Sequence, residues 1–136
     1  TNVTVVDPVY KQKAAYDIIS PCALGGTINK NSLKNINCNI IAGAANNQLE
    51  NDTDVPEELL KKNILYIPDF LINAGGIISV YHEQINDIDS KKVMDMTGLI
   101  YDKVSSVIKY SEENSISTNS SAIQLAKDRI KENSKK

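Results

Sequence analysis

The sequence contains no tryptophan and a single phenylalanine, and aromatic residues make up only 5% of its 136 residues. A hydrophobic core must therefore be built mainly from aliphatic side chains. The sequence also lacks an apolar stretch of the roughly 20 residues that a membrane-spanning helix requires, and it has no recognisable signal peptide. These absences predict a cytoplasmic protein without a membrane partner.

Grouped basic residues and metal-ligand spacings are also missing. The formal net charge is −2, and the lysines are scattered apart from a few near the C-terminus. Nucleic-acid binding requires clustered positive charge that displaces counterions, so we expect no nucleic-acid partner. The cysteines, Cys22 and Cys38, lie beside apolar runs without the spacing of metal ligands. We expect no metal and two buried free thiols, as in a reducing cytosol.

Short apolar runs alternate with helical patterns along the chain. The runs predict strands at 3–6, 16–20, 38–43 and 64–67, and the helical patterns predict a turn at 32–35 and helices at 55–62, 73–84 (or 75–84), 89–111 and from Ser117 or Asn119 onward. This alternation predicts an α/β fold with a largely parallel sheet, flanking helices and a C-terminal helical pair. We expect Asp54 to cap the helix at 55–62 and the polar tail, 131–136, to fray.

Three motifs follow three of the predicted strands. They are PCALGG at 21–26, AGAANNQL at 42–49 and PDFLINAGG at 68–76. Loops at the carboxyl ends of parallel strands are where open α/β sheets bind ligands. The phosphate-binding turn Gly-x-Gly-x-x-Gly is absent, so the pattern indicates half of a nucleotide-binding fold.

The three motifs, in this order, resemble the C-terminal nucleotide-binding half of the glutamate, leucine, phenylalanine and valine dehydrogenases, with leucine dehydrogenases as the nearest. The resemblance runs over nearly the whole chain. It implies an incomplete Rossmann-like domain that binds NAD. It also implies the oxidative deamination of an L-amino acid to a 2-oxo acid and ammonia.

The same resemblance implies that part of the family's machinery lies outside residues 1–136. The family's N-terminal domain carries a substrate-binding lysine, a catalytic lysine and a catalytic aspartate, and the glycine-rich phosphate turn precedes this region. We therefore expect the chain to be inactive alone and assign it no catalytic residue. A separate N-terminal dehydrogenase chain and a homo-oligomer are the implied partners. The alternatives are a non-catalytic binding module or gene remnant that reuses the fold, and another nucleotide-dependent enzyme.

The resemblance assigns cofactor contacts to four residues. Asn46 would recognise the nicotinamide carboxamide or nearby ribose, since an amide offers both a donor and an acceptor, and the adjacent Asn47 is assigned with it. Cys22 and Ala23 would bring the backbone beside the nicotinamide ribose. The alternatives are a turn asparagine that bonds its own backbone and an ordinary strand-to-loop exit.

Substrate contacts are assigned to Asn73, Ile77 and Val80. Ile77 and Val80 are three residues apart on a predicted helix and so share a face. Glutamate dehydrogenases have a serine at the position of Val80, whereas valine cannot donate a hydrogen bond to a substrate carboxylate. The resemblance thus implies a branched aliphatic substrate such as leucine; the alternative is that both side chains are plain core. We expect His82 to be a solvated helix residue.

Overall fold

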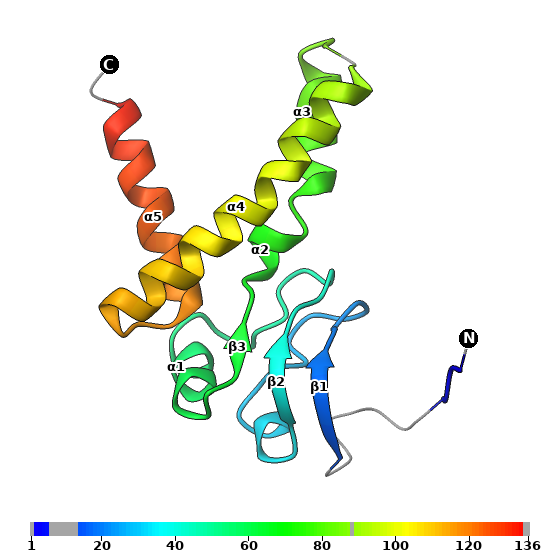
Figure 1. Cartoon of the computed structure of the whole chain (residues 1–136), viewed down its shortest axis with the longest axis vertical. Helices are drawn as coiled ribbons and strands as arrows, with labels where there is room; N and C mark the ends of the chain where they lie inside the picture. Colours follow the sequence, from blue (N-terminus) through cyan, green and yellow to red (C-terminus); the bar gives the residue numbers. More distant parts are fainter. Residues whose placement is uncertain (1, 6–13, 88, 135–136) are drawn as a thin grey trace.

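Three parallel strands form the centre of the structure, a computed structural model that describes residues 2–5, 14–87 and 89–134. The strands are β1 (Ala15–Ile19), β2 (Asn37–Ile41) and β3 (Leu65–Tyr66), hydrogen-bonded in the order β1-β2-β3 (Figure 1). Both pairings are parallel. The α/β fold with a parallel sheet is therefore confirmed. β1 is an edge of this sheet, and its Ile18 is 58% exposed.

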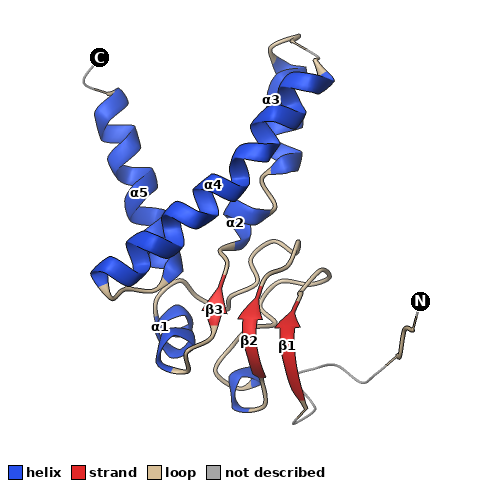
Figure 2. Ribbon diagram, viewed as in Figure 1, coloured by secondary structure: helices blue, strands red, loops and turns tan. Residues whose placement is uncertain are grey.

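Helices follow β2 and β3: the helix after β2 lies beside the sheet, and the helices after β3 extend away from it (Figure 2). The helices are α1 (Asp54–Lys61), α2 (Asp69–Ile72), α3 (Gly75–Gln84), α4 (Ser90–Asn114) and α5 (Thr118–Asn133), with a 3₁₀ turn, η2 (Ser32–Lys34). α1 and α5 both contact β3, and α4 contacts α2, α3 and α5. The described helices lack the combination of length and hydrophobicity that crossing a membrane demands.

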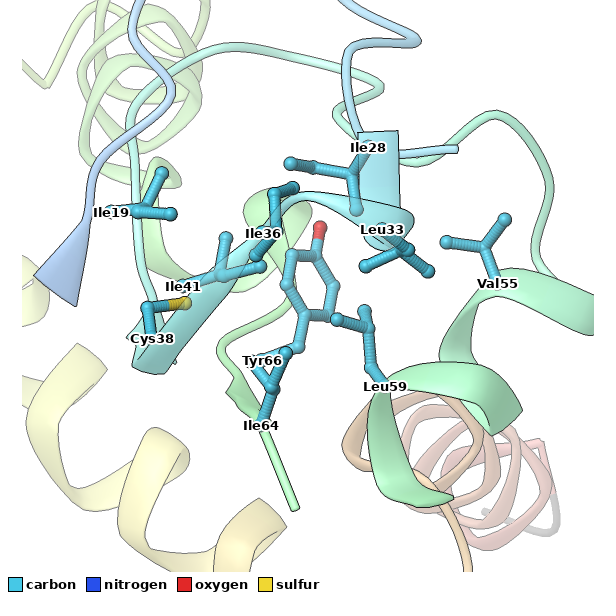
Figure 3. Close-up of a cluster of buried hydrophobic side chains, with 10 residues drawn as sticks. All are labelled: Ile19, Ile28, Leu33, Ile36, Cys38, Ile41, Val55, Leu59, Ile64 and Tyr66. Atoms are coloured by element: carbon cyan, nitrogen blue, oxygen red, sulfur yellow. The ribbon is translucent and has the colours of Figure 1, made fainter. Parts of the chain in front are cut away.

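The core lies between the sheet, η2 and α1 (Figure 3). Its side chains are mostly aliphatic, as the composition predicts: Ile19, Ile28, Leu33, Ile36, Cys38, Ile41, Val55, Leu59, Ile64 and Tyr66. Ile41 and Leu59 are almost completely buried, and burial of such a side chain contributes about 1.5–3 kcal/mol. Tyr66 is the aromatic member, and burial followed by the charge of Asp69 raises the pKa of its hydroxyl group well above the usual value.

Several local predictions are wrong. Val3 and Val5 are exposed and belong to no strand; residue 6 of the predicted strand lies outside the described residues. The short helix α2 has no counterpart among the predicted elements. The cap of α1 is also different, because Asn51 Oδ1, not the side chain of Asp54, accepts from the backbone N–H groups of residues 53–55. α5 continues through residues 131–133, so the start of the tail does not fray.

His82 is buried, which contradicts the prediction of a solvated residue: it is only 6% exposed. Its Nδ1 lies 3.2 Å from the Asp87 carbonyl oxygen and its Nε2 lies 3.0 Å from the Met96 sulfur. The ring therefore joins the end of α3 to α4. The turn between these helices folds α4 back against α3, and the sequence period of α3 gives no sign of this burial.

Gly43 allows the loop after β2 to touch the loop after β1. A Cβ atom on Gly43 would lie 2.1 Å from the Pro21 carbonyl oxygen and 2.5 Å from the Pro21 nitrogen. Both obstacles are backbone atoms, so the substitution requires the two loops to separate.

We expect Gly43→Ala to lower the free energy of unfolding by about 3 kcal/mol or more, because the overlap cannot relax by a rotamer change. Gly98 is the matched control. It lies inside α4, and an added Cβ atom there would meet open space, so Gly98→Ala should raise stability by about 0.5–1 kcal/mol. Urea denaturation of both variants measures the difference, and equal effects would contradict the packing argument.

Candidate functional site

Three loops meet at the carboxyl ends of the strands, as the order of the motifs predicts (Figure 1). Four backbone hydrogen bonds join the loop after β1 to the loop after β2, and two of them lie nearest the strand ends and Asn47. Ala45 N–H donates to the Pro21 carbonyl oxygen at 2.9 Å, and Gly26 N–H donates to the Asn47 carbonyl oxygen at 2.8 Å. Asn47 has a φ of 53°, a left-handed conformation that asparagine tolerates. The backbone of Asn47 thus forms the turn of the loop after β2 and accepts a hydrogen bond from the loop after β1.

Asn73, which directly follows α2, connects the segment after β3 to the loop after β2. Its Nδ2 donates to Asn46 Oδ1 at 2.6 Å and lies 3.4 Å from the Ala44 carbonyl oxygen. We name these two side chains, Asn46 and Asn73, the amide pair. The structure thus places two of the predicted site residues, one for cofactor and one for substrate, in direct contact.

The amide pair still has hydrogen-bonding capacity. One bond joins the two side chains, and no further partner exists in the described part of the chain for the Asn46 amino group or the Asn73 carbonyl oxygen. An amide has two donor hydrogens and an acceptor oxygen. The pair therefore presents a donor on one residue and an acceptor on the other, and this holds whichever way the amides are assigned. That set is complementary to the carboxamide of a nicotinamide ring.

The Gln48 side chain stabilises the loop after β2 by binding backbone groups of that loop. Gln48 is not among the predicted site residues. It is completely buried, and its Nε2 donates to the carbonyl oxygens of Gly43 at 2.7 Å and Ala45 at 2.9 Å. Its sequence position, after two asparagines, is typical of a polar turn. No pattern in the sequence indicates burial there.

Asp69 is the second residue that sequence reasoning misses. It is 8% exposed. Its Oδ2 accepts from the Gln48 N–H at 3.1 Å and its Oδ1 accepts from the Phe70 N–H at 2.8 Å. The carboxylate thus lies between the loop after β2 and the first turn of α2.

Cys22 and Ala23 line an apolar hollow of about 170 Å³ beside β1, together with Ser20, Leu24 and Thr27 among others. Cys22 is exposed, contrary to the expectation of a buried thiol, whereas Cys38 is buried as expected. A hydrogen bond with the Ser20 hydroxyl, then one with the Ala44 backbone, lowers the Cys22 pKa. Burial raises the pKa of Cys38.

Asn46 and Asn47 line a different hollow, polar and about 510 Å³ in volume, together with Gln48, Glu50, Asp52 and Asp69 among others. The predicted cofactor residues are therefore divided between two depressions, one lined by the loop after β1 and one lined by the loop after β2. No group of three or more His, Cys, Asp or Glu side chains in residues 2–5, 14–87 and 89–134 is arranged to hold a metal ion.

Ile77 and Val80 lie on α3, beyond the amide pair. They are 68% and 45% exposed, so the alternative that they are plain core is wrong. Two apolar side chains on one exposed helix face are available to contact a ligand or another protein segment. Neither residue lines the apolar or the polar hollow.

Comparisons with known proteins identify the family of this chain. Residues 3–136 match the model of the Glutamate/Leucine/Phenylalanine/Valine dehydrogenase family. The chain belongs to this family. An L-tryptophan dehydrogenase from Nostoc punctiforme is 45% identical over 129 residues, which are 95% of this chain and 36% of the relative. The crystal structure of L-tryptophan dehydrogenase from Nostoc punctiforme superposes with a TM-score of 0.90 and 43% identity, over 98% of this chain and 39% of that one.

A leucine dehydrogenase from Bacillus cereus is 39% identical over 131 residues, 95% of this chain and 35% of the relative. The tryptophan dehydrogenase is therefore the more similar of the two, which corrects the expectation that leucine dehydrogenases are the nearest relatives. The chain spans about a third of the length of the dehydrogenases it matches.

The two cysteines should differ in reactivity. We expect iodoacetamide at about pH 8 to alkylate Cys22 at least about ten times faster than Cys38, because the thiolate is the nucleophile and Cys22 is exposed with a lowered pKa. Peptide mass spectrometry after timed quenching measures both rates, and Cys22→Ser should remove the fast phase. A fast phase that belongs to Cys38 would contradict the positions of the thiols.

Proposed function

We propose that this chain forms the nicotinamide end of the cofactor site in an NAD-dependent L-amino-acid dehydrogenase. The amide pair is the observation that carries the proposal, since its free donor and acceptor match a carboxamide. In this site Asn46 holds the carboxamide together with Asn73. The resemblance alone assigns Asn73 to the substrate, and its hydrogen bond to Asn46 supports the assignment to the cofactor instead. Cys22, Ala23 and Asn47 bring backbone groups beside the attached ribose.

The chemistry of the proposed reaction is oxidative deamination. Bound NAD supplies the acceptor for the hydride that leaves the α-carbon of the amino acid. Water replaces the amine, and the products are a 2-oxo acid and ammonium. The acid–base groups come from a region that carries the family's lysines and aspartate, in the same polypeptide or a separate one. The role of this chain is to orient the ring.

The proposed substrate has an apolar side chain. Ile77 and Val80 supply an aliphatic wall that cannot pair with a carboxylate, and an unpaired buried carboxylate costs several kcal/mol. The wall supports a branched aliphatic substrate such as leucine. An aromatic amino acid is the second candidate, because the tryptophan dehydrogenase from Nostoc punctiforme is more similar than the Bacillus leucine dehydrogenase.

A chimera tests the proposal. Residues 14–134 replace the matching segment of the Nostoc punctiforme tryptophan dehydrogenase, and NADH formation is followed at 340 nm with leucine, tryptophan, phenylalanine and glutamate. We expect NAD reduction with the apolar amino acids and at least about a hundredfold lower kcat/KM for glutamate, equivalent to about 2.7 kcal/mol. The unsubstituted dehydrogenase is the control for folding and assembly.

Val80→Ser is the matched variant in the same chimera, since it restores a hydroxyl donor on the substrate wall. It should narrow the difference between glutamate and leucine without changing the KM for NAD. A chimera that assembles like its parent but reduces NAD with none of the four amino acids would contradict the function. That result would favour a non-catalytic module that reuses the fold.

A further inference from the structure

We propose that Gln48 and Asp69 are positioning residues that hold the amide pair in the geometry needed for a carboxamide. The inference rests on the proposed function, because it assigns to two residues outside the ligand contacts the task of fixing Asn46 and Asn73. Both residues lie within the motifs at 42–49 and 68–76, but the resemblance assigns neither of them a contact with cofactor or substrate. Both are buried, and their side chains form hydrogen bonds to backbone groups at the junction of the loops. The Asp69 N–H also donates to the Tyr66 hydroxyl oxygen at 3.3 Å.

Gln48 closes the loop around Asn46. Its side chain binds the carbonyl oxygens of Gly43 and Ala45, at 2.7 and 2.9 Å, on one side of Asn46. Its backbone carbonyl oxygen accepts from the Ile28 N–H at 3.0 Å on the other side. The segment that carries Asn46 is thus tied to itself and to the loop after β1.

Asp69 joins this closed loop to the element that carries Asn73. Its carboxylate accepts from the N–H groups of Gln48 and Phe70, and its own carbonyl oxygen accepts from the Asn73 N–H at 3.0 Å. Besides the direct bond between the two amides, the Asp69 side chain therefore links the loop that carries Asn46 to the helix that directly precedes Asn73. A rotation of α2 against the loop after β2 would break these bonds.

The chemistry of the two side chains explains why substitutes would fail. A buried carboxylate offers acceptors only, and both backbone partners are donors, so an amide at position 69 would turn its amino group toward one N–H. The Gln48 Oε1 atom is buried without a partner in the described chain. The fold leaves this acceptor unsatisfied but keeps both hydrogen bonds from Nε2 to the carbonyl oxygens of Gly43 and Ala45. This indicates that the Gln48 side chain maintains the conformation of the loop after β2.

The first test uses the chain alone and needs no activity. In ¹H–¹⁵N spectra we expect the side-chain amide signals of Asn46 and Asn73 to be dispersed. We expect Asp69→Asn and Gln48→Met to shift both to the values of free asparagine, with the core signals unchanged. Asp17→Asn, on the exposed edge strand, is the control and should change neither signal.

The second test uses the active chimera and separates positioning from stability. It compares kcat/KM for NAD with kcat/KM for the 3-acetylpyridine analogue, whose methyl group replaces the carboxamide amino group. We expect Asp69→Asn to reduce the preference for NAD at least about tenfold. In an Asn73→Ala background, which removes the acceptor for the carboxamide amino group, the same substitution should change the ratio less than twofold.

The outcomes separate the two proposals. An inactive parent chimera contradicts the proposed function, and the spectra still decide the positioning role. If the parent chimera is active and Asp69→Asn lowers kcat/KM for NAD and for the analogue by the same factor, the positioning role is wrong. If both variants keep the two amide signals, the residues do not position the pair, and the proposal is wrong. If both variants unfold, the residues serve only the overall fold, and the proposal is likewise wrong.

Discussion

The buried amide of Gln48 is the constraint on which the arrangement of the loops depends. Parallel strands deliver their loops to one edge of a sheet, but this does not fix the loops relative to one another. Here one residue binds two carbonyl groups of its own loop through its side chain and a carboxylate from the next loop through its backbone. Glycine at position 43 then allows the loop after β1 to pack without a gap. Asn46 and Asn73 meet as a consequence of these contacts.

Much of the framework could be predicted from the sequence because its signals are local. The β-branched runs around Ile18, Ile40 and Leu65 form strands, and Ser117 caps the last helix by accepting from a backbone N–H. Local signals were less decisive where two residues competed. Asn51 and Asp54 are both suitable caps, and the structure uses the one whose oxygen reaches three N–H groups.

The rest depends on contacts between distant segments, which a single sequence does not show. Asp69 lies 21 positions from Gln48, and nothing in either neighbourhood indicates that one carboxylate joins two loops. His82 has ordinary polar helix neighbours, and its burial follows from the turn that brings Met96 against it. Val3 and Val5 have strand-forming side chains but no paired strand among the described residues. The exposed face of Ile77 and Val80 likewise depends on what α3 packs against.

The most direct test of the account is a titration of the ¹⁵N-labelled chain with NAD. If the three loops form one nicotinamide-binding surface, the backbone signals of Cys22, Asn46 and Asn73 should shift together along one saturable curve. Signals around Leu60 and Ile108, which line a separate apolar pocket between α1 and α4, should remain unchanged. Shifts confined to one loop, or equal shifts at the separate pocket, would contradict the account.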